Sequence, residues 1–210
     1  MGEQEMRAVA FDCFGTLLRI TEPTNPWRPL LAEARRQPGA RMLDPRREPI
    51  LTIEEFAAAC GVPFRPKWRD DLDREIASIA VMPDALPVLS SLRAAGFRLA
   101  LASNLATAYV EPALALLGDS IDTDCLSCDP EILAVKPEPA FFSALQRKIV
   151  LPAAEILMVG DSLASDVEGA KAASMAALHL VSGETSPRPG QIRHLADVPQ
   201  FLGLNQPGSS

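Results

Sequence analysis

Five polar residues that could attack or bind an anionic group follow short apolar runs in this 210-residue sequence. They are Asp12, Ser103, Lys136, Asp161 and Asp166. An aspartate can act as a carboxylate nucleophile. Two carboxylates that lie close together repel each other unless a cation lies between them, and Mg²⁺ is a hard ion that takes carboxylates, carbonyls and waters. Serine and lysine donate hydrogen bonds to anionic oxygens, so the set suits phosphoryl transfer, in which positioning and charge neutralisation do most of the catalysis.

The apolar runs that precede these residues have the length and composition of buried strands. We expect strands over residues 8–11, 98–102, 123–127, 156–159 and 177–181, and helices over 83–95, 107–117, 137–149 and 165–173. Strands that alternate with helices of this length indicate a parallel sheet. Ligands of such sheets bind beyond the carboxyl ends of the strands, so the five polar side chains should meet at one edge.

The alternation of strands and helices is interrupted after the first strand. Residues 19–81 contain no convincing buried strand and instead predict helices over 27–36, 53–60 and 67–80. The sequence therefore predicts an α/β fold: a Rossmann-like parallel sheet core formed by residues 1–18 and 82–210, with an inserted small helical cap domain, residues 19–81.

Four segments resemble, in order, the four motifs of the haloacid dehalogenase-like (HAD) hydrolases. They are Ala8–Leu17, Leu99–Asn104, Lys136-Pro137 and Met158–Asp166. The resemblance implies that Asp12 forms a covalent aspartyl intermediate while Ser103 and Lys136 hold the transferring group. It also implies an Mg²⁺ ion bound by Asp12, Asp161 and the backbone carbonyl of Phe14, with Asp166 supporting the metal through water or orienting Lys136. Thr16 and Asn104, in the first two motifs, are further candidates for binding phosphate.

Phe14 departs from the pattern of the family's phosphatases, which usually carry a second aspartate there as general acid and base. A phenyl ring cannot protonate a leaving alkoxide. The family's dehalogenases often have an aromatic residue at this position, because halide leaves without a proton. Asp161 and Asp166, however, match the Mg²⁺-dependent phosphatases. The prediction is an Mg²⁺-dependent phosphatase of small phosphorylated metabolites; the alternatives are a 2-haloacid dehalogenase and a catalytically weak binding or regulatory protein.

The overall composition excludes some other classes of function. A net charge of −7 argues against generic nucleic-acid binding, and no apolar run approaches the roughly 18 residues of a membrane span. The polar N-terminus is unlike a signal peptide, so we expect a cytoplasmic protein whose partner is a small anionic molecule. The CxxC pair Cys125 and Cys128 has no second ligand pair, and we expect reduced structural thiols. We expect His179 and His194 to be structural as well.

Overall fold

Six parallel strands form the sheet that carries the predicted site, in a computed structural model that describes residues 5–183 and 186–204. The strand order is β5-β4-β1-β6-β7-β8, and every neighbouring pair is parallel. The strands are β1 (Ala8–Phe11), β4 (Arg98–Ser103), β5 (Thr123–Leu126), β6 (Ile156–Gly160), β7 (Ala176–Leu180) and β8 (Gln191–Ile192). The five predicted strands are therefore confirmed to within a residue at each end, and β8 is an addition.

Strand β1 shows why these runs are apolar throughout. All four of its residues are buried, and they alternate between two clusters. Val9 and Phe11 point to one face of the sheet, and Ala8 and Ala10 point to the other. Because a parallel sheet is covered on both faces, its strands read as continuous apolar runs.

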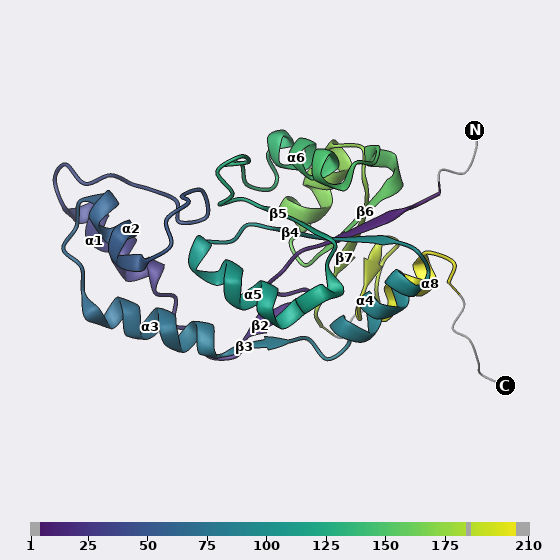
Figure 1. Ribbon diagram of the computed structural model, residues 1–210, viewed down its shortest axis with the longest axis horizontal. Helices are drawn as coiled ribbons and strands as arrows, with labels where there is room; N and C mark the ends of the chain where they lie inside the picture. The colour runs from purple at the N-terminus through teal and green to yellow at the C-terminus, as the bar shows by residue number, and fades with distance from the viewer. Residues whose placement is uncertain (1–4, 184–185, 205–210) are drawn as a thin grey trace.

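Helices cover both faces of the sheet (Figure 1). The face with Val9 is covered by α4 (Ala85–Ala94), α5 (Val110–Leu117) and α8 (Asp197–Phe201), and the other by α6 (Pro139–Ile149) and α7 (Gly169–Ala172). The predicted helix over 107–117 begins as a 3₁₀ turn, η1 (Thr107–Tyr109), and that over 165–173 begins as a π-helical segment, η4 (Leu163–Glu168). Two further 3₁₀ turns are η2 (Gly118–Ser120) and η3 (Ala153–Glu155).

The insertion after β1 contains α1 (Trp27–Arg36), α2 (Ile53–Cys60) and α3 (Pro66–Ala77). Thr52 and Glu55 form a capping box at the start of α2, and Pro66 stands in the first turn of α3, where its missing N–H costs nothing. The first two predicted helices are confirmed. The third ends three residues early, because the chain continues into β3 (Ile79–Val81), which pairs antiparallel with β2 (Leu18–Ile20).

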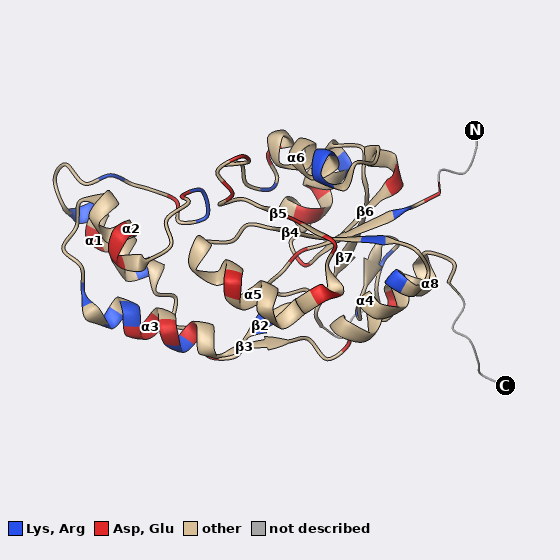
Figure 2. Ribbon diagram, viewed as in Figure 1, with Lys and Arg blue, Asp and Glu red and all other residues tan. Residues whose placement is uncertain are grey.

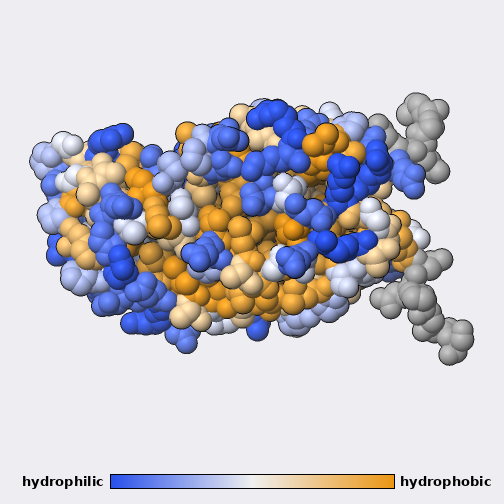
Figure 3. Space-filling model, viewed as in Figure 1, coloured by the Kyte–Doolittle hydropathy of each residue, from blue (hydrophilic) through white to orange (hydrophobic). Residues whose placement is uncertain are grey.

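The insertion shares its apolar core with one face of the sheet. Leu30, Phe56 and Trp68 belong to the same buried cluster as Val9 and Phe11. Figure 3 shows hydrophobic residues gathered over the middle of the molecule, where α5 and the β2–β3 ribbon lie. The division into a core of residues 1–18 and 82–210 and a cap of residues 19–81 stays a prediction, and β2 runs across its first boundary.

The surface of α1–α3 carries basic and acidic side chains interspersed (Figure 2). Several pair with one another, as Arg65 does with Glu33 at 2.9 Å and Arg69 does with Glu54. Among the described residues, no helix combines the length and the apolar character needed to span a bilayer.

Candidate active site

Asp12 lies at the carboxyl end of β1, between the ends of β4 and β6. Asp12 is 8% exposed, and one oxygen of its carboxylate, Oδ1, accepts hydrogen bonds from Ser103 Oγ at 2.9 Å and from Lys136 Nζ at 2.7 Å. In the described part of the chain no protein group donates to the other oxygen, Oδ2. Asp12 therefore keeps one carboxylate oxygen available to attack an electrophile or to bind a cation.

Lys136 joins two of the predicted carboxylates. The residue is only 4% exposed, and its ammonium donates to Asp12 Oδ1 at 2.7 Å, Asp166 Oδ1 at 2.6 Å and the carbonyl of Ala102 at 2.6 Å. Burial alone would lower the pKa of Lys136, but the charges of Asp12 and Asp166 outweigh it and raise the pKa above its usual value. Lys136 is thus a fixed cation at the end of the sheet.

Asp161 completes an acidic cluster with Asp12 and Asp166. One carboxylate oxygen from each lies within 4.8 Å of the others. Burial raises the pKa of Asp161, and the negative charges of Asp12 and Asp166 raise it further. Carboxylate oxygens are the donors that hard divalent cations prefer, and a cation would relieve this repulsion, so the donor set fits Mg²⁺. The cluster carries three carboxylates and one ammonium, which leaves a surplus of negative charge.

Two glycines allow the acidic side chains to come this close. A Cβ on Gly15, whose φ is +86°, would lie 2.2 Å from Asp161 Oδ2. A Cβ on Gly160 would lie equally close, at 2.2 Å, to Asp166 Oδ2. Any larger residue at either position would displace the carboxylate that the site needs.

The π-helical segment η4 places Asp166 under the site. The backbone N–H of Ser162 donates to Asp166 Oδ2 at 2.9 Å, so both oxygens of this carboxylate are bound, one by Ser162 and one by Lys136. Asp166 is 1% exposed. This geometry suits a residue that orients Lys136, which is one of the two roles that the resemblance implies for it.

A cavity of about 160 Å³ opens beside Asp12, Lys136 and Asp166, and Asp161 is not among the residues that line it. Of the predicted residues, it is lined by Asp12, Phe14, Ser103, Asn104, Lys136 and Asp166. Ser162 and Ser165 also line it, and sequence reasoning did not single them out, although both lie within the fourth motif. Phe14 thus stands at the wall of the cavity, where it presents a phenyl ring and no acid.

Two predicted phosphate ligands are placed differently from the others. The side-chain amide of Asn104 is engaged with the backbone of Lys136: it accepts from the Lys136 N–H at 2.8 Å and donates to the Lys136 carbonyl at 3.0 Å. Thr16 is fully buried, its hydroxyl has no hydrogen-bond partner in the structure, and it is not among the residues that line the cavity. Asn104 therefore holds the backbone of Lys136, and Thr16 is buried away from the cavity.

Cys125, Cys128 and His179 agree with structural roles, and the structural role expected of His194 stays a prediction. Cys125 and Cys128 are buried free thiols, and burial raises the pKa of Cys13, the neighbour of Asp12. His179 Nε2 lies 3.0 Å from the carbonyl of Asp161 and lends support to the backbone of the metal-binding candidate.

The insertion reaches this edge of the sheet through its loop 44–48. Ser127 donates to the carbonyl of Arg46 at 2.6 Å, Thr107 donates to that of Glu48 at 3.1 Å, and Arg47 pairs with Glu138. Glu138 is two residues beyond Lys136. The loop is therefore held against the core beside the third motif.

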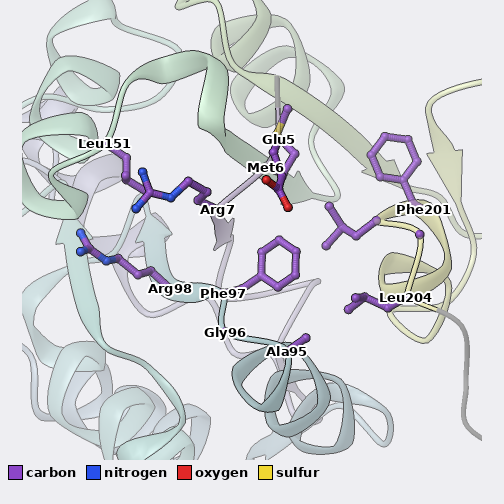
Figure 4. Close-up of a pocket in the computed structure, with 12 residues that line it drawn as sticks. Glu5, Met6, Arg7, Ala95, Gly96, Phe97, Arg98, Leu151, Phe201 and Leu204 are labelled. Carbon is purple, nitrogen blue, oxygen red and sulfur yellow. The ribbon is translucent and has the colours of Figure 1, made fainter. Parts of the chain in front are cut away.

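A larger cavity of about 820 Å³ lies at the opposite end of the sheet, near the start of β1 and β4 (Figure 4). Phe97 stands at its centre, with Met6 and Phe201 beside it and Arg7 and Arg98 at one side. None of the predicted site residues is among those that line it. The smaller cavity is thus the one that brings the candidate chemistry together.

Comparison with known proteins agrees with the motifs. The family profile described as haloacid dehalogenase-like hydrolase matches residues 6–174. A glyceraldehyde 3-phosphate phosphatase of Methanopyrus kandleri is 32% identical over 130 residues, covering 61% of this chain and 54% of the relative. A phosphoglycolate phosphatase of Yersinia pestis is 31% identical over 131 residues, covering 59% and 56%. The chain spans about half the length of these curated relatives.

Solved structures extend the likeness over nearly the whole chain. A HAD phosphatase from Thermococcus onnurineus superposes with a TM-score of 0.69 at 26% identity, covering 94% of this chain and 98% of the other. An L-2-haloacid dehalogenase superposes with a TM-score of 0.68 at 20% identity, covering 95% and 99%, and shows the fold alone. With its motifs assembled at one edge of the sheet and the family profile matching most of its length, the chain belongs to the haloacid dehalogenase-like hydrolases.

Proposed function

We propose that this chain is an Mg²⁺-dependent phosphatase that hydrolyses monoesters of small phosphorylated metabolites, with Asp12 as its nucleophile. The observation that carries the proposal is the acidic cluster: Asp12, Asp161 and Asp166 each offer a carboxylate oxygen within 4.8 Å of the others, and the one ammonium of Lys136 pairs with two of them, Asp12 and Asp166. A bare cluster of this charge would repel an anionic haloacid. With a divalent cation bound, it can accept a phosphate.

Two related phosphatases favour the same activity. Both a glyceraldehyde 3-phosphate phosphatase and a phosphoglycolate phosphatase match at above 30% identity. A cavity of about 160 Å³ has roughly the volume of five water molecules, which suits a phosphoryl group on a short carbon chain. We infer a small phosphorylated metabolite as the substrate class.

Each residue has a proposed task at the phosphoryl group. Asp12 attacks phosphorus with one carboxylate oxygen and forms an aspartyl phosphate, while the P–O bond to the ester oxygen breaks and that oxygen takes a proton from water to leave as the alcohol; a second water then hydrolyses the aspartyl phosphate and releases inorganic phosphate. Ser103 and Lys136 donate to the non-bridging oxygens. Mg²⁺, held by Asp12, Asp161 and the Phe14 carbonyl, would supply charge neutralisation when bound. Asp166 holds Lys136 in place.

The direct test measures the release of phosphate and the release of halide, each with and without Mg²⁺. We expect phosphate release from a panel of small phosphomonoesters in millimolar Mg²⁺ and its loss in EDTA, because without the cation the three carboxylates repel the substrate. We expect no chloride release from 2-chloropropionate in either condition. Halide release in EDTA would establish the dehalogenase instead. If neither the phosphomonoesters nor 2-chloropropionate were turned over, the result would favour a binding protein.

Phe14 predicts a strong dependence on the leaving group. An alkyl alcohol needs a proton as it leaves, and loss of a general acid typically costs about 10²–10⁴-fold in rate, whereas a nitrophenolate leaves without one. We therefore expect kcat for 4-nitrophenyl phosphate to exceed that for glycerol phosphate by about 10²-fold or more at saturating Mg²⁺.

The matched variant for this prediction is Phe14→Asp, which places a carboxyl group at the wall of the cavity. It should raise kcat for glycerol phosphate more than kcat for 4-nitrophenyl phosphate, so the ratio of the two kcat values should fall. Equal kcat values on both esters in the wild-type protein would contradict the prediction and would point to another proton donor.

A further inference from the structure

A buried carboxylate in the insertion is bound by a hydroxyl from the core. Glu75, in the last turn of α3, is 6% exposed. Its Oε2 accepts from the backbone N–H groups of Thr24 and Asn25, both at 2.7 Å, which lie just before α1. Its Oε1 accepts from the hydroxyl of Tyr109 at 2.9 Å, and Tyr109 belongs to η1, next to the second motif. This hydrogen bond therefore joins α3 of the insertion to the core.

The hydroxyl of Tyr109 has a second partner in the insertion. It accepts from the indole N–H of Trp27, the first residue of α1, at 3.3 Å. Burial raises the pKa of Tyr109, and the nearby charge of Glu75 raises it further, so the hydroxyl remains a donor at any working pH. One atom of the core thus contacts both α1 and α3.

The ring of the same tyrosine reaches the catalytic loop. It packs against the ring of Phe14 in a T-shaped arrangement, with centroids 5.7 Å apart and an interplanar angle of 82°. Phe14 stands two residues beyond Asp12 and lines the catalytic cavity. The contact at loop 44–48 also holds the insertion on the core, but it does not touch Phe14. Tyr109 therefore contacts both the insertion, through Trp27 and Glu75, and the residue that forms the wall of the catalytic cavity, Phe14.

We propose that Tyr109 is a positioning residue that holds the insertion docked on the core and fixes Phe14 at the cavity wall. This inference rests on the proposed phosphatase function for its kinetic readout. If the hydroxyl is lost, the docked arrangement, in which Phe14 is fixed at the cavity wall, becomes a smaller fraction of the free enzyme. Apparent substrate affinity falls by that fraction, while bound substrate still selects the docked form.

The test is Tyr109→Phe, which removes the hydroxyl and keeps the ring against Phe14. Tyr109 is the single tyrosine of the chain, so the change is complete in one substitution. Losing this hydrogen bond and leaving the Trp27 N–H unpaired should raise KM about tenfold, with kcat within about twofold of the wild type. Tyr109→Leu removes the ring contact as well and should also lower kcat, because Phe14 loses its support.

The matched control is Thr52→Ala, which removes the cap of α2 inside the insertion and touches neither Tyr109 nor Glu75. A variant that is merely less stable has less folded enzyme, so its apparent kcat falls and its KM stays constant. For Thr52→Ala we therefore expect a constant KM and an apparent kcat that is unchanged or lower. A Tyr109→Phe protein with an unchanged KM, or with the pattern of the control, would overturn the proposal.

Hydrogen–deuterium exchange tests whether Tyr109 holds the insertion on the core, and it needs no substrate. Tyr109→Phe should speed exchange in α1 and α3 relative to the wild type, while Thr52→Ala should act mainly on α2. Unchanged exchange in α1 and α3 would refute the role of Tyr109 even if the wild-type chain proved not to be a phosphatase. Faster exchange with no wild-type phosphatase activity would leave the positioning role standing and remove the proposed function.

Discussion

Lys136→Met is expected to lower the free energy of unfolding by about 3–5 kcal/mol and to abolish phosphatase activity. Methionine is close to lysine in length but carries no charge. Lys136 is the cation that directly contacts both Asp12 and Asp166, which are 8% and 1% exposed. Removing one partner of a buried ion pair leaves an uncompensated buried charge, and such changes typically cost this much. Urea unfolding followed by tryptophan fluorescence measures the difference.

The chain offers a matched control in Lys148→Met. Lys148 also bridges two aspartates, Asp129 at 2.9 Å and Asp124 at 3.5 Å, but these side chains are partly exposed to solvent. Partly exposed pairs contribute about 1 kcal/mol or less. Millimolar Mg²⁺ should also restore more stability to K136M than to K148M, since a divalent cation binding the native cluster stabilises it by mass action. If both variants lost the same free energy of unfolding, the ion pairs of Lys136 would not contribute more to stability than those of Lys148.

The sheet could be predicted from sequence because its strands are buried on both faces. β1 and β6 are entirely buried, so their sequences are continuous apolar runs that stand out from the helices. β2 and β3 could not be found in this way. Each has three residues, of which one is buried, so no periodicity develops, and their pairing joins Leu18 to Val81 across the whole insertion.

The same limit applies to the site. Asp12, Ser103, Lys136, Asp161 and Asp166 follow strands of one parallel sheet, and topology alone brings such positions to one edge. The attachment of Asn104 to the Lys136 backbone depends on the path of a loop. The Tyr109–Glu75 contact depends on how the insertion packs. Neither the loop path nor the packing leaves a local pattern in the sequence.

Asp12→Asn is expected to lower kcat by about 10³-fold or more while changing the free energy of unfolding by less than about 1 kcal/mol. An amide of the same shape is a poor nucleophile, and loss of a nucleophile typically has an effect of this size. Ser103 and Lys136 donate to Oδ1 of Asp12 in the wild-type protein, and the amide oxygen of the variant can accept the same two hydrogen bonds. Removing one charge from the acidic cluster also lessens its repulsion, so the fold should tolerate the change.

The control for Asp12→Asn is Asp119→Asn, an exposed aspartate in η2 that should leave both kcat and stability unchanged. Intact mass must confirm that the amide of the D12N protein has not deamidated to aspartate. Quenching wild-type turnover with hydroxylamine should convert an aspartyl phosphate into a hydroxamate, which peptide mass spectrometry would locate at residue 12. Activity that survives in D12N, or a hydroxamate on another carboxylate, would show that Asp12 is not the nucleophile. The acidic cluster would then serve only to bind the cation and the substrate.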